Sequence, residues 1–198
     1  MSLSISSGFD SGNIIVKDAS DPNNVRLEIA KDHQSDFYMW FHFRVVGEKG
    51  QKVRLILENA GGASYTKGWE TYSAVVSADS ETWRRVPTQY DGKTLTIDAE
   101  LTQGALYVAY FAPYSSARHQ QLIADTIKDD RARTQVLGQT LDGRDLDMIT
   151  IGAPGPEKRT IWVTARQHPG ETMAEWWMEG FLNRLLDPIS ADAKHLLE

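Results

Sequence analysis

The 198-residue sequence has no cysteine, no long apolar run and no excess of basic residues. The lack of cysteine excludes disulfide bonds, thiolate metal sites and cysteine nucleophiles. No apolar stretch approaches the roughly 18 residues that a membrane-spanning helix requires, so no membrane partner is expected. With 27 acidic and 21 basic residues the formal charge is −6. This balance argues against nucleic acid as a partner, because phosphate binding requires a basic surface.

The first ten residues, MSLSISSGFD, have neither the basic n-region nor the apolar h-region of a secretory signal. We therefore expect a cytoplasmic protein. A hydrophobic content of 41% and a charged content of 24% are ordinary for a globular chain of this length.

Residues 1–114 are predicted to form one domain, an antiparallel β-sandwich. Besides a strand in residues 37–45, strands are expected at 53–57, 95–99 and 105–111. Asp91-Gly92 is typical of a type I′ hairpin turn. No helix is expected before Ser115. The period-two alternation in residues 37–45 places five apolar residues on one inward face: Phe37, Met39, Phe41, Phe43 and Val45.

Residues 115–198 follow a different pattern, typical of the first part of an α/β domain. Ser115 or Ser116 is expected to cap a helix over 117–129. Two strands at 134–137 and 146–151, joined by Asp142-Gly143, are expected to form a hairpin. The predicted fold class is therefore α/β plus all-β.

An apolar strand at 160–165 and an amphipathic helix over 172–186 complete the predicted second domain. The helix carries an apolar stripe with the spacing of a core-facing surface. Its exposed part is also expected to favour self-association. The stripe consists of Ala174, Trp177, Met178, Phe181, Leu182 and Leu185.

His168-Pro169-Gly170-Glu171 joins this strand to this helix. One imidazole and one carboxylate are two of the three protein ligands of many hydrolytic zinc sites, which leave one position open for water. Open α/β sheets bind ligands at the carboxyl ends of their strands. His-x-x-Glu alone is a common pattern, so two structural roles stay open. Glu171 is also favourable as an acid in the first helical turn, and His168 as a loop residue bonded to backbone.

Arg166 is a further candidate site residue, as an anchor for a substrate carboxylate or another anion. A third metal ligand is not evident among the other four histidines. We expect His42 to be exposed on its strand and His33 to lie in a polar loop. His119 and His195 are expected to be solvated on their helices.

The order HPGET, after an apolar strand and before a Trp-rich helix, resembles the zinc-binding start of the metallocarboxypeptidases of the carboxypeptidase A/B superfamily. The resemblance is to the cytosolic-carboxypeptidase-like branch, in which a β-sandwich precedes the peptidase domain. Residues 107–115, YVAYFAPYS, resemble the junction between those domains. Residues 137–144 and 146–152 resemble the first hairpin of the peptidase sheet.

The resemblance implies a zinc-dependent enzyme that hydrolyses C-terminal residues from peptides or proteins. It makes His168 and Glu171 the first two zinc ligands, and it places the third ligand and the general-base Glu downstream of Glu198. Residues 115–198 would then be an incomplete zinc carboxypeptidase domain, inactive by itself. Digestive members have a substrate-binding Arg between the two ligands, whereas this chain has Gly170, so their side-chain preference is not carried over.

Two other functions stay open at this point. A zinc amidohydrolase that acts on a non-peptide substrate would have the same site residues. Alternatively, a sandwich that binds peptide or glycan would use an exposed aromatic platform, against which stands the ordinary packing of aromatics in a core. The residues available for such a platform are Trp40, Tyr65, Trp69, Tyr72 and Trp83.

Overall fold

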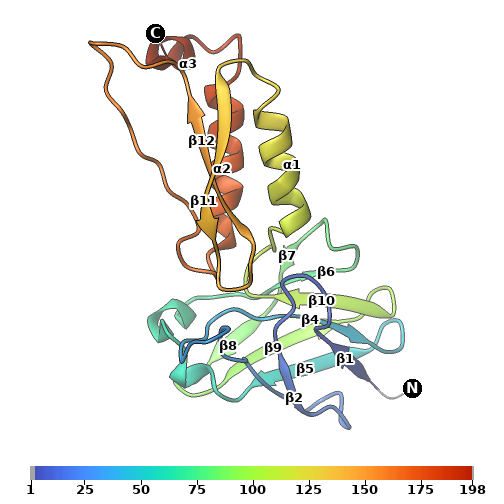
Figure 1. Ribbon diagram of the computed structural model, residues 1–198. Coiled ribbons are helices and arrows are strands. Elements are labelled where there is room, and N and C mark those ends of the chain that lie inside the picture. The colour runs from blue at the N-terminus through green and yellow to red at the C-terminus, as the bar shows by residue number, and fades with distance from the viewer. Residues whose placement is uncertain (1–2, 198) are drawn as a thin grey trace. The chain divides into compact units, whose positions relative to one another are not determined.

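The computed structural model describes residues 3–197, and the chain divides at Pro113–Tyr114 into two compact units (Figure 1). The part up to Pro113 is called the first unit, and the part from Tyr114 the second unit. Within residues 3–197, no helix is both long and apolar enough to cross a membrane.

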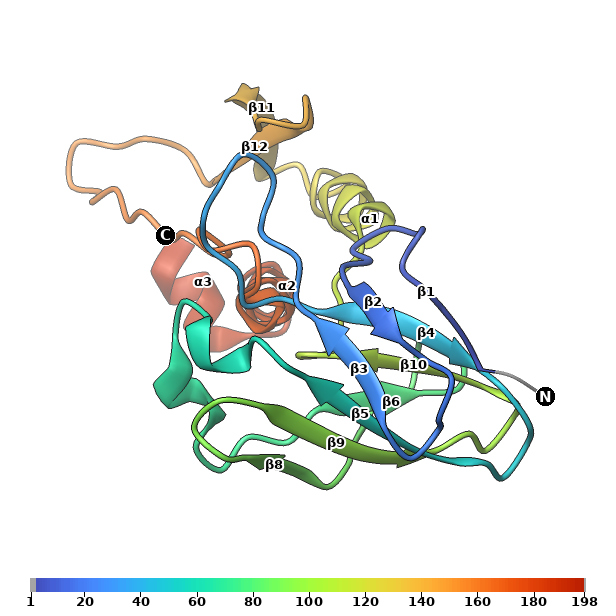
Figure 2. The same cartoon turned by 90° about the horizontal axis from the view of Figure 1, so that it is seen from below.

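The first unit contains two five-stranded sheets, which lie face to face in Figure 2. Sheet order is β1-β4-β10-β6-β7 in one and β2-β3-β5-β9-β8 in the other. The strands of the first sheet are β1 (Ser4–Ser6), β4 (His42–Val46), β6 (Val75–Ser77), β7 (Arg84–Arg85) and β10 (Ala105–Ala109). Those of the second are β2 (Ile15–Asp18), β3 (Val25–Glu28), β5 (Lys52–Leu57), β8 (Thr88–Tyr90) and β9 (Leu95–Glu100).

A single apolar core fills the space between these sheets, because alternate residues of the central strands point inward. Burial of each large apolar side chain stabilises the fold by about 1.5–3 kcal/mol. The predicted fold class is confirmed, with one difference: β3 pairs with β5 in parallel, so the second sheet is mixed. Core residues from the two sheets include Phe43, Val45, Leu106 and Val108 on one side and Leu27, Val53, Leu55, Leu57 and Ile97 on the other.

The strand predicted over 37–45 begins only at His42. Phe37 is 70% exposed, and its backbone N–H and C=O are taken by Ser35 Oγ and by the N–H of Asp32. Because local loop contacts use these groups, the segment before His42 cannot pair in a sheet. Phe41 is buried, as predicted. Two short 3₁₀ turns, Ala60–Gly62 and Thr66–Trp69, also precede Ser115, where no helix was expected.

The hairpin predicted at Asp91-Gly92 is confirmed, but its turn is longer than a two-residue type I′ turn. Tyr90 pairs with Leu95, so four residues connect β8 to β9. Gly92 has φ +94°, where glycine is favoured. The Asp91 carboxylate accepts hydrogen bonds from the backbone N–H groups of Lys93 and Thr94. These bonds lower the pKa of Asp91 to about 2.

His42 is buried, although an exposed position was predicted. It does lie on the side of β4 opposite the core, but aromatic rings cover it there, among them Phe9 at 4.9 Å and Trp83 at 5.7 Å between ring centroids. Its Nδ1 lies 2.9 Å from Ser11 Oγ. Its Nε2 is buried without a hydrogen-bond partner, alone among the side-chain polar atoms of residues 3–197. Burial lowers the pKa of His42 to about 4.

The second unit consists of α1 (Ser116–Thr126), the hairpin β11 (Ala132–Gln139) and β12 (Asp145–Ile151), then α2 (Thr172–Leu185) and α3 (Ala191–Leu197). Ser115 caps α1 as predicted, since its Oγ accepts a hydrogen bond from the Arg118 N–H. The hairpin is also confirmed, and Gly143 has φ +73° in its turn. The core is small: its buried members are Tyr114, Leu122 and Leu182.

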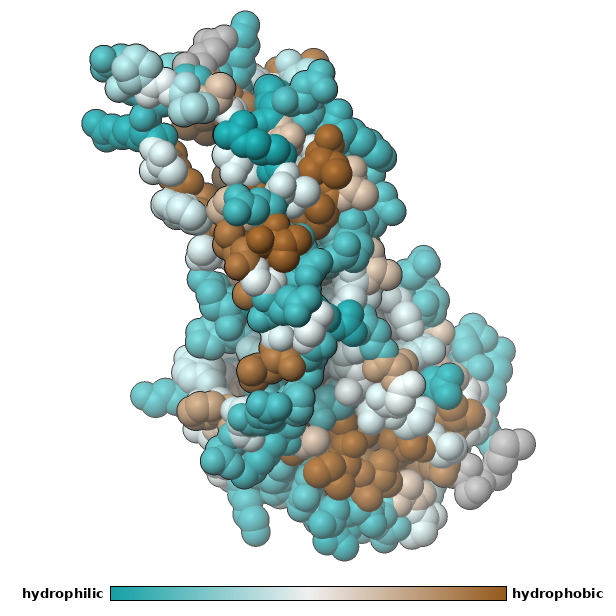
Figure 3. Space-filling model, in the orientation of Figure 1, coloured by the Kyte–Doolittle hydropathy of each residue, from teal (hydrophilic) through white to brown (hydrophobic). Residues whose placement is uncertain are grey.

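The strand predicted at 160–165 does not form in the described structure. Among residues 114–197 the one sheet consists of β11 and β12, and the backbone of 160–165 has no ladder partner there. Ile161 is 75% exposed and Trp162 74% exposed. The stripe of α2 is also less buried than predicted, because Trp177 is 54% exposed. Figure 3 shows apolar surface on the part of the molecule formed by the second unit.

The buried His42 predicts a loss of stability in mild acid. Its pKa is about 4 in the folded chain and about 6.5 when unfolded, so the unfolded chain binds the proton more readily. The pH-dependent contribution of His42 to the free energy of unfolding is fully present above pH 6.5. It is lost as the pH drops toward 4, by up to about 3 kcal/mol. Urea unfolding between pH 7 and pH 4 measures the loss.

His42→Gln should lose less stability over this range than the wild type, whereas His195→Gln, at an exposed position on α3, should lose as much. Equal acid sensitivity in all three proteins would contradict the assignment to His42.

The exposed apolar side chains of the second unit predict self-association of the 198-residue chain. Trp162→Gln should lower the average mass measured by light scattering at high concentration, because it removes a large exposed apolar surface. Tyr65→Gln is a matched control, since Tyr65 is also an exposed aromatic, at 62%. A strictly monomeric wild type would rule the interaction out.

Candidate metal centre

His168 and Glu171 are brought together by a tight turn. The Glu171 N–H donates to the His168 carbonyl at 3.0 Å, and Pro169 occupies the second position of this four-residue turn. The ends of a β-turn have Cα atoms within about 7 Å of each other. Residues 168–171 are called the ligand turn below. It leads directly into α2, and both His168 and Glu171 are exposed.

The Glu171 side chain makes no capping hydrogen bond, although Glu171 is the N-cap residue of α2. Its carboxylate is therefore not used by the end of the helix. An imidazole nitrogen and a carboxylate oxygen are donors that zinc accepts in hydrolytic sites, so the pair fits two positions of such a centre. Among residues 3–197 there is no group of three or more His, Cys, Asp or Glu side chains placed to hold a metal.

Arg166 lies just before the ligand turn, and its guanidinium donates hydrogen bonds to Tyr114, Pro169 and Glu175 of the second unit. Nη1 donates to Glu175 Oε2 at 2.5 Å and to the Tyr114 carbonyl at 3.0 Å. Nε donates to the Pro169 carbonyl at 3.3 Å, within the ligand turn. Arg166 itself has φ +54°, a left-handed conformation that costs a non-glycine residue about 1–2 kcal/mol.

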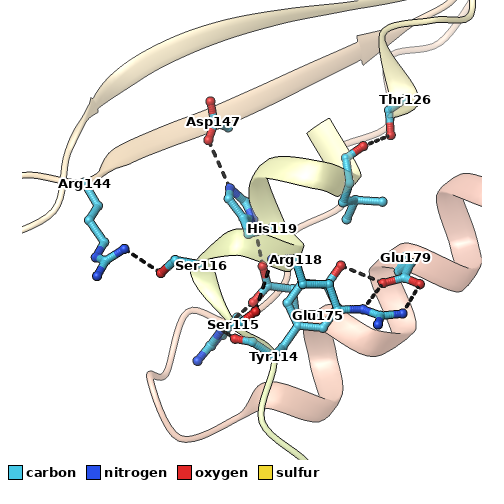
Figure 4. Close-up of polar contacts among 12 residues, drawn as sticks. Tyr114, Ser115, Ser116, Arg118, His119, Thr126, Arg144, Asp147, Glu175 and Glu179 are labelled. Carbon is cyan, nitrogen blue, oxygen red and sulfur yellow. Dashed lines mark hydrogen bonds and ion pairs between the residues drawn. The ribbon is translucent and has the colours of Figure 1, made fainter. Parts of the chain in front are cut away.

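His119 is a partner of two carboxylates, although a solvated position was predicted. From α1, its Nδ1 lies 2.7 Å from Glu175 Oε1 and its Nε2 lies 3.0 Å from Asp147 Oδ2 on β12 (Figure 4). The hydrogen bond with Glu175 raises the pKa of His119, and the contact with Asp147 adds to this against the opposing effect of burial. His119 therefore stays protonated to higher pH than a solvated histidine, and links α1 to both α2 and β12.

Glu175 is a buried acid on α2, with 8% of its surface exposed. Burial alone raises the pKa of its carboxyl, but the hydrogen bonds from His119 and Arg166 outweigh burial and the net direction is downward. One oxygen serves each partner, so both are used. Glu175, Met178 and Leu182 follow helical spacing on one face, and an acid at such a position signals a buried partner. The sequence prediction missed this signal.

A second polar group fixes α1 to α2. Arg118 donates to both carboxylate oxygens of Glu179, at 2.7 and 2.8 Å, and the Tyr114 hydroxyl donates to the same carboxylate at 2.7 Å. The Arg118 guanidinium also lies 4.0 Å from the ring centroid of Trp176. This bidentate pair, visible in Figure 4, aligns α1 with α2, the helix that carries Glu175.

The other histidines do not approach the ligand turn within the described contacts. His195 is exposed on α3 and His33 is exposed in a loop, as predicted. Three members of the proposed aromatic platform, Trp40, Trp69 and Tyr72, are buried in the core of the first unit. They therefore cannot form an exposed binding surface.

Both units match families of known proteins. Residues 5–111 match the cytosolic carboxypeptidase N-terminal domain, and residues 121–198 match zinc carboxypeptidase. An uncharacterized protein of Zymomonas mobilis is 46% identical over 99% of this chain and 50% of its own length. Cytosolic carboxypeptidase 2 of Danio rerio is 28% identical over 98% of this chain and 31% of its own length.

Solved structures agree with these matches. A metallo-carboxypeptidase from Burkholderia cenocepacia is 41% identical, with a TM-score of 0.93 over 100% of this chain and 54% of the other. One from Pseudomonas aeruginosa, in complex with (2-guanidinoethylmercapto)succinic acid, has 41% identity and a TM-score of 0.91 over 98% of this chain and 52% of the other. This chain thus spans about half the length of the bacterial relatives that it matches. By sequence and by fold, the chain belongs to the cytosolic carboxypeptidase branch of the zinc metallocarboxypeptidases.

Proposed function

We propose that the chain is part of a zinc-dependent metallocarboxypeptidase that removes C-terminal residues from peptides or proteins, and that His168 and Glu171 are two of its zinc ligands. The ligand turn carries this proposal. It presents one imidazole and one carboxylate on a single exposed turn, within the residues that match the zinc carboxypeptidase family. The relatives' name supports a cytoplasmic location, which we include in the proposal.

A bound zinc ion would supply a Lewis acid for the scissile carbonyl and would lower the pKa of a bound water. His168 would contribute a neutral nitrogen and Glu171 one negative charge, which leaves the ion a net positive charge for that chemistry. The exposure of both side chains leaves room for water and substrate beside them.

Two protein ligands are fewer than a catalytic zinc site uses. The described residues contain no third ligand grouped with His168 and Glu171. We propose that the third ligand and the general base belong to a further part of a longer protein, and that residues 1–198 alone are inactive. Arg166 stays a candidate for binding the substrate carboxylate. Such a contact would have to share its guanidinium with Glu175.

The alternatives differ in how they fare. A binding platform on the first unit is disfavoured because Trp40, Trp69 and Tyr72 are buried. A zinc amidohydrolase with a non-peptide substrate would use the same ligand turn. Only a substrate screen that includes both peptides and other amides separates it from a carboxypeptidase.

The proposed function predicts a strict requirement for both ligands. In a protein extended through the remainder of the peptidase domain, His168→Ala or Glu171→Ala should remove bound zinc. Each should also lower the release of C-terminal residues from a peptide library by at least about 10³-fold, because the metal supplies much of the transition-state stabilisation. Zinc is measured by elemental analysis and released residues by mass spectrometry.

His195→Ala and Glu157→Ala are matched controls, since both positions are exposed and lie outside the ligand turn. Both controls should keep zinc and activity. Full zinc content and activity in His168→Ala would end the proposal.

The 198-residue chain should bind zinc only weakly. Two ligands leave the ion mostly to water, and binding must also order the site. Titration against a chelating dye should give an affinity at least about 100-fold below that of the extended protein, and His168→Ala should weaken it further. Equal affinities in the short and extended proteins would contradict the need for a third ligand.

A further inference from the structure

The guanidinium of Arg166 holds the ligand turn from within. Its side chain reaches forward to the Pro169 carbonyl at 3.3 Å, between the two candidate ligands. It also binds the first turn of α2 through Glu175 and the backbone of Tyr114 at the start of the second unit. One side chain therefore joins the ligand turn to two other segments of the same unit.

The backbone of Arg166 adds a second observation. Its φ of +54° lies in the left-handed region, which an arginine adopts only when surrounding contacts outweigh the cost. The side-chain bonds to Pro169, Tyr114 and Glu175 are such contacts. The chain bends directly after Arg166, at Gln167 and His168. This bend separates the exposed segment 160–165 from the ligand turn.

Glu175 is itself held in place from the opposite side. Its side chain is 11% exposed, and the oxygen that does not face Arg166 is bound by His119. The other nitrogen of His119 meets Asp147, whose side chain is 9% exposed. Arg166, Glu175, His119 and Asp147 thus contact one another in series, and their charges alternate when His119 is protonated. These contacts anchor the guanidinium to α2, α1 and β12.

We propose that Arg166 is a positioning residue for the metal ligands: anchored by Glu175 and His119, it fixes the ligand turn so that His168 and Glu171 point to one metal ion. The proposal rests on the proposed function for the metal and its two ligands, whereas the ordering of the turn by Arg166 is tested independently of it. Ligand side chains must be held to within about 0.5 Å for a metal site to work, and an exposed turn after an unpaired segment needs an anchor to reach that precision. Arg166 provides it.

This role differs from that of a substrate anchor. An anchor for the substrate carboxylate would change the KM of the extended enzyme and leave its zinc affinity unchanged. A positioning residue changes zinc affinity and the order of the ligand turn when no substrate is present. The two roles are therefore separated by measurements on the chain without any peptide.

The test compares the 198-residue wild type with Arg166→Ala, Arg166→Lys, Glu175→Gln and Arg184→Ala. Arg184 is the matched control, because it lies on α2, makes an ion pair with Asp187 and is 63% exposed. Hydrogen exchange of peptides covering 166–172 measures the order of the ligand turn, with β11 and β12 as the internal reference. Zinc binding is measured by competition with a chelating dye and by the ¹⁵N shifts of the His168 ring.

In Arg166→Ala, exchange in 166–172 should be at least about 10-fold faster, while exchange in β11 and β12 is unchanged. Zinc affinity should fall about 10-fold, the lower end of the loss when a residue that orients a ligand is removed. The His168 ring shifts should then appear only at higher zinc concentration. Arg166→Lys keeps the charge for Glu175 but lacks the planar fork, so it should restore thermal stability without restoring zinc affinity. Glu175→Gln should give a smaller change in the same direction as Arg166→Ala.

Exchange and zinc affinity in Arg166→Ala equal to those of Arg184→Ala would overturn the proposal. Should Arg166→Ala lose its fold, seen as fast exchange in β11 and β12, the same comparison with Glu175→Gln decides. A wild type that binds zinc no better than His168→Ala would instead refute the proposed metal site. The exchange measurements would still decide whether Arg166 orders the turn.

Discussion

The arrangement of the second unit depends on the contacts of the Glu175 carboxylate with His119 and Arg166. This carboxylate is buried, and burying an unpaired charge costs several kcal/mol, so its two partners are a requirement of the fold. Removing one partner of a buried pair typically destabilises a protein by about 3–5 kcal/mol, because the remaining charge is left unpaired. His119 and Arg166 meet this requirement from different segments, and the ligand turn obtains its place as a result.

The two units are stabilised in different ways. The first unit has a continuous apolar core between two sheets, while the apolar cluster in the described part of the second has three buried members, Tyr114, Leu122 and Leu182. Charged groups contribute a larger share of the order in the second unit, and their strength depends on pH and on the geometry of each pair. Regions with few buried apolar contacts open more easily than a large core. The candidate site therefore lies on the unit that we expect to open more easily by local unfolding.

The sequence predicted those elements that are determined by residues close together in the chain. Ser115 before α1 and the glycines in the two hairpin turns set local backbone geometry, and each appears where it was expected. The predictions that were wrong concern features that depend on residues distant in the sequence. Residues 160–165 have the composition of a strand, but a strand exists only beside a partner. His42 is buried because rings distant in sequence cover it, and His119 is paired because two carboxylates from α2 and β12 meet at its ring.

The candidate site was partly predictable for the same reason. His168 and Glu171 are close in sequence, so a turn alone brings them together. The contacts of Arg166 with Tyr114 and Glu175 depend on the folded unit, and only the apolar spacing around Glu175 hinted at them. The sequence thus predicted the candidate ligands but not what holds them.

The exposed stretch TIWVTA, residues 160–165, also bears on how the chain avoids misassembly. It is uncharged and rich in residues that favour strands, which is the composition of segments that stack between copies of a chain. Arg159 and Arg166 bracket it, and in-register stacking would place these like charges side by side. In the folded chain the charge of Arg166 is paired with Glu175, whereas in a newly made chain it is not. The same arginine would thus act as a gatekeeper against aggregation before folding and, once folded, as the anchor of the turn.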